Sequence, residues 1–284
     1  MKLPKPLIAG AGFVAPVALC VAVRPSRARA LAAIALNMRA YVAAYEMPHD
    51  DPEALAARTR VGYPAAADRV LGLGAPPTLR LQRAFSAPGT VKWFERILVW
   101  CHWLWFFFPH LSVLYVLVRR PEKFAGAAGR MYAVFDIGAV FYWVIPTAPP
   151  WWAAAHGRLE DSEPTEVRRM MIEYAEEFWG DLFGPLYDVL GGNPFAAMPS
   201  LHFATSLMGA HLLDEVDPIA GAVGWGYATT LGLALVYLGE HYLVDLIAGA
   251  ALTEGVRAAA PWATPMAKRL SRQLGTLQVL GENG

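Results

Sequence analysis

The stretch from Ile97 to Val118 carries no formally charged side chain. A helix of about 20 apolar residues crosses the hydrocarbon core of a bilayer, and in lipid its backbone hydrogen bonds must be satisfied within the segment. The whole chain has a matching composition, since 56% of its 284 residues are apolar and only 17% are charged. We therefore predict an all-α, polytopic membrane bundle of about six transmembrane helices, with amphipathic helices at the interface.

Other apolar segments supply the remaining spans, and they cover Leu7–Val23, Phe124–Pro146, a stretch that starts near Ala196, Pro218–Gly239 and Leu246–Ala260. The first of these resembles a signal-peptide core. Because three arginines follow it directly, we interpret it as a retained helix.

Residues 1–96 otherwise form an N-terminal and membrane-interface segment. Larger apolar residues recur with helical spacing from Leu31 to Tyr45. This helix is either a second span or an amphipathic helix that lies in the interface. Residues 46–96 show no motif, and we expect a surface and interfacial segment there.

Arg119, Arg120 and Lys123 lie between two predicted spans. By the positive-inside rule this basic loop is cytoplasmic. The spans that begin near Ala196 and His241 then both start at the outer face. We therefore expect a multi-pass protein of the cell membrane with its active site on the extracytoplasmic side.

The large outer loop between these spans contains an amphipathic pattern. Ser162 is a candidate N-cap, and apolar residues recur from Val167 to Leu182. The pattern predicts a helix at the membrane surface. It is either a lid over the site or a helix that simply packs on the bundle.

Two short motifs begin apolar runs in the C-terminal third. In the first, Pro199 suits the first position of a helix. The backbone N–H groups of Ser200, Leu201 and His202 would then be free to bind an anion at the helix N-terminus. In the second, His241 and Asp245 are four residues apart and would share a helix face. A carboxylate placed there fixes the imidazole tautomer of a nucleophilic or acid–base histidine.

These motifs resemble the type 2 phosphatidic acid phosphatase superfamily, in which Pro-Ser-x-His precedes His-x-x-x-Asp. The chain is most similar to the inositol phosphorylceramide synthase-like branch, which also has a Pro-rich patch like Pro146–Trp151. The resemblance covers roughly residues 97–260. It implies His241 as the nucleophile, Asp245 as the residue that orients it and His202 as the general acid. This chemistry requires no metal ion, and we expect no cofactor.

The chain departs from typical lipid phosphatases at two places. The Ser-Arg pair before the third motif is replaced by Ala234 and Leu235. Lys123 and Arg130 have the spacing of the family's first motif, but they lie at the predicted inner end, and we interpret that match as a coincidence. The phosphate would instead be held by further candidates, which are Ser200, Leu201, His156, Arg158 and, as a second-tier residue within a span, His102.

The zero formal charge gives no indication of a nucleic acid partner, and two cysteines give no disulfide or metal framework. We expect residues 97–261 to form a catalytic membrane core and residues 262–284 a basic cytoplasmic tail. The expected activity is transfer of a phospho-headgroup from a phospholipid donor to a lipid or polyol acceptor through a phosphohistidine. A lipid-phosphate or polyprenyl-pyrophosphate phosphatase and a catalytically silent membrane scaffold are the alternatives.

The geometry expected of this site is specific. His202 and His241 should face one cavity with a phosphate-sized gap between their rings, and Asp245 should contact the ring of His241.

Overall fold

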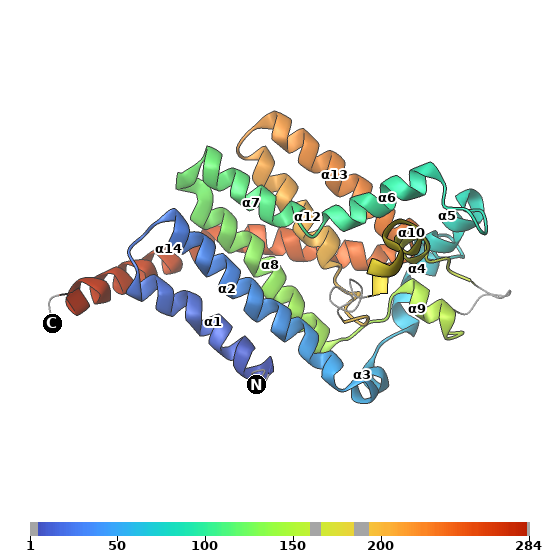
Figure 1. Ribbon diagram of the computed structural model, residues 1–284, viewed down its shortest axis with the longest axis horizontal. Coiled ribbons are helices and arrows are strands. Elements are labelled where there is room, and N and C mark those ends of the chain that lie inside the picture. The colour runs from blue at the N-terminus through green and yellow to red at the C-terminus, as the bar shows by residue number, and fades with distance from the viewer. Residues whose placement is uncertain (1–4, 160–165, 185–192, 283–284) are drawn as a thin grey trace.

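The computed structural model describes residues 5–159, 166–184 and 193–282, and these residues form an all-α bundle without a β-strand (Figure 1). The predicted fold class is confirmed. The α-helices are α1 (Lys5–Ala22), α2 (Arg27–Glu46), α3 (Pro52–Arg58), α4 (Gly62–Leu71), α5 (Pro77–Phe85), α6 (Trp93–Leu104), α7 (Phe108–Arg119), α8 (Phe124–Val144), α9 (Pro150–Ala155), α10 (Met170–Trp179), α12 (Leu201–Asp214), α13 (Pro218–Tyr237) and α14 (Leu243–Glu282). Short 3₁₀ helices cover Met47–Asp50, Pro121–Lys123 and Gly180–Leu182.

Helix α12 lies at the centre of the bundle, in contact with α7, α8, α13 and α14. Its side chains Leu201, Met208 and Leu212 are buried against Met131 and Phe135 of α8. Helices α1 and α2 pack on each other, and α2 also packs on α8. Because α12 is buried along its length, the residues at its N-terminus are held from several sides.

The membrane-spanning capacity of the bundle is concentrated in its longer helices. Within the described residues, Pro121–Val144 and Pro218–Tyr237 are long and apolar enough to cross a bilayer, and the bent pair Trp93–Leu104 and Phe108–Arg119 is a further candidate span. The chain is thus an integral membrane protein. The total of about six spans stays a prediction.

The predicted span Ile97–Val118 differs from the structure, because it is not one straight helix. It divides into α6 and α7, which are bent by 58°. Pro109 lies in the first turn of α7. Since proline has no backbone N–H to donate to the preceding turn, a continuous helix cannot run through it unbroken. The bend leaves His102 in the last turn of α6.

The short helices α4, α5, α9 and α10 gather at one end of the bundle, whereas the junction of α7 and α8 lies at the other end (Figure 1). Backbone hydrogen bonds join three separate segments at the first end. Arg60 N donates to Pro146 O at 2.8 Å, and Thr147 N donates to Phe195 O at 2.8 Å. The Pro-rich patch is therefore connected both to the N-terminal segment and to the loop that leads into α12.

The predicted outer-loop helix is present but begins later than expected. Helix α10 starts at Met170, while Val167 is buried in irregular backbone and Ser162 lies outside the described residues. The Tyr174 ring stacks on Trp103 of α6, with 5.7 Å between ring centroids. This packing favours the second alternative, a helix fixed to the bundle.

Two basic residues of the predicted inner end pair with one loop. Arg130 forms two hydrogen bonds to the Glu215 carboxylate, and Lys123 donates to the Glu215 carbonyl at 2.7 Å. The Arg130 guanidinium lowers the pKa of Glu215. Both cations are therefore engaged at the α12–α13 turn, away from the helix ends that carry His202 and His241.

Helix α14 does not end where the predicted catalytic core ends. It continues beyond Ala260 through Pro261 and Pro265 to Glu282. The residues expected to form a basic tail are thus a helical extension of the last long helix.

Candidate active site

The first motif forms the N-terminus of α12, two residues later than expected. Ser200, rather than Pro199, is next to the helix, and its hydroxyl accepts the Phe203 N–H at 3.3 Å. The Ser200 N–H is not free, because it donates to the Asp245 carbonyl at 3.0 Å. The N–H groups of Leu201 and His202 precede the first intrahelical bond, from Ala204 N to Ser200 O. The Leu201 N–H is directed at the Tyr142 hydroxyl. The His202 N–H is therefore the donor that the helix end can offer to an anion.

Helices α12 and α14 approach each other closely where the two motifs meet. A Cβ atom on Gly249 would lie 2.6 Å from the Ser200 carbonyl oxygen. Only glycine fits at this distance. The Thr253 hydroxyl donates to the Ala204 carbonyl at 2.8 Å and adds a second connection. The small residues of α14 thus bring His202 beside the second motif.

The second motif differs from the expected helix face. Gly239 turns the chain with a φ of 77°, a value that glycine adopts without strain. Helix α14 then begins only at Leu243. His241 therefore precedes the helix, and Asp245 lies in its first turn, where its carboxylate accepts the Tyr242 N–H at 2.9 Å.

The His241 ring and the Asp245 carboxylate are neighbours, as the spacing predicted. His241 Nδ1 lies 3.4 Å from Asp245 Oδ2, slightly longer than a good hydrogen bond. Both side chains are buried, and within the described part of the chain Nδ1 of the histidine and Oδ1 of the aspartate have no hydrogen-bond partner. A small ring rotation would complete this bond and fix the proton on Nδ1.

The two motif histidines contact each other directly. His202 Nδ1 lies 3.2 Å from His241 Nε2. When Nδ1 of His241 holds its proton toward Asp245, Nε2 is the acceptor and the His202 N–H is the donor. The expected phosphate-sized gap is absent between these two described rings.

The His202 ring lies between two aromatic neighbours. Its centroid is 4.1 Å from that of Trp105 and 4.8 Å from that of His102. The Trp105 indole is itself fixed, because it donates to the Thr205 hydroxyl at 2.8 Å. His102 is buried, and its Nδ1 atom has no partner among the described residues. The structure thus brings His102 to the motif histidines.

Asp68 on α4 is a site-supporting residue that the sequence interpretation missed. Its carboxylate accepts the N–H groups of Leu243 and Val244, both at 2.8 Å, and so caps the start of α14. The side chain is fully buried, and this burial raises the pKa of Asp68 to about 6. The sequence offered one indication of this role. Asp68 follows Pro64 by four residues and Ala65 by three, so it lies on the same buried face of the helix.

Arg169 and Glu240 form a second feature that the sequence interpretation missed. The Arg169 guanidinium lies 3.7 Å from the centroid of the Trp151 ring and 3.9 Å from a Glu240 carboxylate oxygen. Glu240 immediately precedes His241 in the chain. Burial raises the pKa of the Glu240 carboxyl, and Arg169 opposes this shift.

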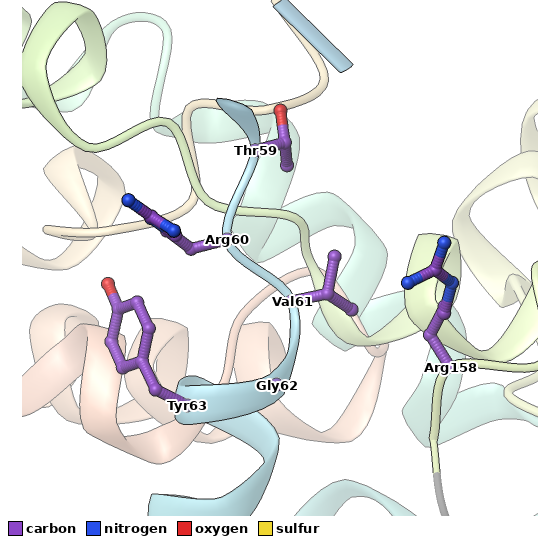
Figure 2. Close-up of a pocket in the computed structure, with 6 residues that line it drawn as sticks. All are labelled: Thr59, Arg60, Val61, Gly62, Tyr63 and Arg158. Atoms are coloured by element: carbon purple, nitrogen blue, oxygen red, sulfur yellow. The ribbon is translucent and has the colours of Figure 1, made fainter. Parts of the chain in front are cut away.

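The two predicted outer-loop candidates lie apart from the histidine pair. The His156 ring stacks on Trp152, with 3.8 Å between centroids, and both His156 and Arg158 are exposed. Arg158 borders a surface hollow of about 340 Å³, together with the segment from Thr59 to Tyr63. Figure 2 shows the Arg158 and Arg60 guanidinium groups on opposite sides of that segment, so they do not converge on one anion. No contact within the described residues joins either candidate to His202, His241 or Asp245.

No group of three or more histidine, cysteine or acidic residues in the described ranges has the geometry of a metal site. Ala234 and Leu235, at the positions of the Ser-Arg pair in typical lipid phosphatases, are fully buried. Neither of these two positions can therefore contribute a cationic side chain.

Comparison with known proteins gives a consistent family assignment. The profile of the PAP2 superfamily matches residues 65–259, a range that contains Asp68, both motif histidines and Asp245. No solved structure matches the fold.

Two curated relatives have the same printed activity. An inositol phosphorylceramide synthase of Candida albicans is 28% identical over 55% of this chain, and the catalytic subunit aur1 of Schizosaccharomyces pombe inositol phosphorylceramide synthase is 29% identical over 51%. Each alignment covers 34% of the relative. The chain thus matches about a third of the length of these relatives.

Proposed function

Because this chain belongs to the PAP2 superfamily, we propose that it is an integral-membrane lipid phosphotransferase that moves a phospho-headgroup from a phospholipid donor to an alcohol acceptor. The coarser assignment, an enzyme of the phosphatase or phosphotransferase type, follows from the family and from the names of the relatives. One observation carries the proposal. Asp245 contacts the His241 ring, and the His241 ring in turn contacts the His202 ring. Nε2 of His241, the proposed nucleophile, is directed at His202, the proposed acid.

The first half-reaction uses His241 Nε2 as the nucleophile. Its lone pair attacks the donor phosphorus, and the bond from phosphorus to the departing alkoxide breaks. An anionic phosphate near the rings stabilises protonated His202, which gives its proton to the alkoxide. The Asp245 carboxylate supports the positive charge that develops on His241. A phosphohistidine remains.

The second half-reaction reverses these roles. The oxygen of an acceptor alcohol attacks the phosphorus, its proton passes to His202, and the nitrogen–phosphorus bond breaks. General acid–base assistance of this kind contributes roughly 10²- to 10⁴-fold to a rate. The N–H group of His202 at the start of α12 would stabilise a phosphate oxygen in both steps.

The choice of a transferase rests on the charge of the site. A phosphate monoester carries more negative charge than a diester and needs more cationic partners. Buried Ala234 and Leu235 replace the family's Ser-Arg pair, so a singly charged phosphodiester suits this site better. The names of both relatives support the same preference.

We further place the active site at the extracytoplasmic face. Arg119, Arg120 and Lys123 lie at the end of the bundle opposite the short helices (Figure 1). The positive-inside rule assigns such a basic end to the cytoplasm. The histidines, at the other end, would then meet substrates in the outer leaflet.

Product analysis tests this function. The purified protein in mixed micelles is incubated with a phospholipid radiolabelled in its headgroup phosphate, with and without an acceptor alcohol. We expect a labelled product whose formation depends on the acceptor. Rapid release of inorganic phosphate from phosphatidic acid or polyprenyl pyrophosphate, without an acceptor-dependent product, would identify a phosphatase instead.

A further inference from the structure

Arg169 and Glu240 form an ion pair in which each side chain has one polar atom without a hydrogen-bond partner among the described residues. Arg169 Nη2 and Glu240 Oε1 are 3.9 Å apart, beyond hydrogen-bond distance. Arg169 Nε and Glu240 Oε1 are both buried and have no hydrogen-bond partner among the described residues. Buried polar atoms without partners are costly, so such atoms beside an active site indicate a missing ligand group.

The pair is held firmly in this open arrangement. The Arg169 guanidinium lies over the Trp151 ring at 3.7 Å, and the backbone N–H of Trp151 donates to the Gly239 carbonyl at 3.1 Å. The Trp151 side chain also hydrogen-bonds the Glu240 carboxylate. Val167 packs against Gly239, so closely that no Cβ atom would fit there. The residues on both sides of the pair are thus fixed to the turn that carries His241.

The position of the pair connects it to the reaction. Glu240 and His241 are consecutive, and their Cα atoms are therefore about 3.8 Å apart. A group bound between Arg169 and Glu240 lies within one residue of the proposed nucleophile. A substituent on the transferred headgroup or on the attacking alcohol could extend over this distance.

The chemistry of the pair selects one kind of group. Arg169 offers a donor, and Glu240 offers an acceptor. A phosphate oxygen would satisfy the arginine but would be repelled by the carboxylate. A hydroxyl accepts from the arginine and donates to the carboxylate, so it satisfies both atoms at once.

We infer that Arg169 and Glu240 form a hydroxyl-binding subsite for a polyhydroxylated headgroup or acceptor. This inference rests on the proposed function, because the hydroxyl belongs to a substrate of that reaction. The subsite also disfavours a bare phosphate monoester beside His241, in agreement with a phosphodiester donor.

The first experiment compares donors that differ in headgroup hydroxyls. Turnover of phosphatidylinositol and of phosphatidylcholine is measured in mixed micelles for wild type, Glu240→Gln and the control Glu177→Gln. Glu177 is an exposed residue of α10 that pairs with Arg96. If the hydroxyl belongs to the donor, Glu240→Gln lowers the preference for phosphatidylinositol about 10-fold, the loss of one charge-assisted hydrogen bond. Glu177→Gln leaves the preference unchanged.

The second experiment identifies the other source of the hydroxyl. The concentration of glycerol as acceptor is varied at saturating donor, and 1-propanol, which has no second hydroxyl, is the control acceptor. A KM for the acceptor that rises about 10-fold in Glu240→Gln, with donor preference unchanged, assigns the hydroxyl to the acceptor. An equal loss on all substrates, or no change in either experiment, would overturn the subsite.

A binding experiment separates failure of the subsite from failure of the proposed function. Micelles that contain phosphatidylinositol or phosphatidylcholine are titrated into the inert variant His241→Gln, with and without Glu240→Gln, and binding is followed by thermophoresis. Preference for phosphatidylinositol that is lost in the double variant supports the subsite even if no transfer is detected. Equal affinities in both variants for both lipids would contradict it.

Discussion

Two histidine–carboxylate pairs lie beside opposite ends of α12, and only one of them has the surroundings that we propose for an active site. Near one end, His241 lies 3.4 Å from Asp245. Near the other end, His211 of α12 lies 2.8 Å from Glu254 of α14, and Arg257 forms a short contact with the same carboxylate. By distance alone, the second pair is the better ion pair.

The two pairs differ in their surroundings. The side chains of His241 and Asp245 are 5% and 0% exposed, whereas Glu254 is 51% exposed. Arg257 already neutralises Glu254 and also lies 3.1 Å from His211. His241 instead faces a second histidine, and its Nδ1 has no hydrogen-bond partner within the described residues. An active histidine is thus recognised by burial, by an adjacent acid–base partner and by bonds left incomplete, rather than by a nearby carboxylate.

The largest expected difference is between the two paired histidines. Replacement of the nucleophile, His241→Gln, should lower transfer activity by roughly 10⁴-fold or more, because no phosphohistidine can form. His211→Gln, the matched change at the other end, should stay within about 3-fold of wild type, since His211 contacts Glu254 and Arg257 and none of the three motif residues. Headgroup transfer in mixed micelles measures both. Equal losses of transfer activity in the two variants would contradict the distinction between the two histidine–carboxylate pairs.

The second prediction concerns the acid. His202→Gln should lower transfer by about 10³-fold with an ordinary phospholipid, because the departing alkoxide receives no proton. With a substrate whose leaving group is p-nitrophenolate, His202→Gln should slow the first half-reaction far less, because p-nitrophenolate departs without protonation. His110→Gln is the control, since His110 contacts the Tyr132 hydroxyl at 3.2 Å within the bundle. A loss in His202→Gln that is independent of the leaving group would argue against the acid role.

The third prediction compares two helix caps. Asp68 caps α14 from a fully buried position, and Asp217 caps α13 with bonds of 2.9 Å to Ile219 and Ala220. Asp68→Ala should cost about 2–4 kcal/mol, because two buried donors lose their acceptor. Asp217→Ala should cost only about 1 kcal/mol, since water can replace an exposed cap. Unfolding in detergent micelles measures both. A larger loss from Asp217→Ala would contradict the assigned role of Asp68.

The last prediction is a pH dependence. Burial raises the pKa of Asp68 from 3.8 to about 6, so the folded state holds this proton more tightly than the unfolded chain. Its contribution to stability is therefore fully present below pH 3.8 and is lost as pH rises through 6. The slope is at most about 1.4 kcal/mol per pH unit. Unfolding of wild type and Asp68→Asn between pH 4 and 7 measures it, and identical pH profiles would contradict the shift.

The sequence predicted most of the features that depend on local chemistry. Long apolar runs identified the helices, and the Pro-Ser-x-His and His-x-x-x-Asp motifs identified the residues that the structure brings together. It failed where tertiary contacts decide. The direct contact of His202 with His241 depends on the close approach of α12 and α14 at Gly249. The break before Pro109 is different, because the missing N–H of proline is a local signal that the sequence interpretation did not use.

The residues missed by the sequence interpretation act across long separations in the chain. Asp68 reaches the N–H groups of Leu243 and Val244, and Arg169 meets Trp151 and Glu240. No periodicity within one segment reveals such partners. Conversely, His156 and Arg158 were selected for their charge and their place in the outer loop, and the fold directs them elsewhere.

The central claim is that His241 becomes covalently phosphorylated. The direct measurement is rapid acid-free quenching of the protein after incubation with a phospholipid labelled in its headgroup phosphate, followed by peptide mapping. We predict a label that is stable in alkali and labile in acid, located on the peptide that contains His241 and absent from His241→Gln. Acceptor-dependent transfer by wild type with no labelled protein, or an equal label in His241→Gln, would contradict this account.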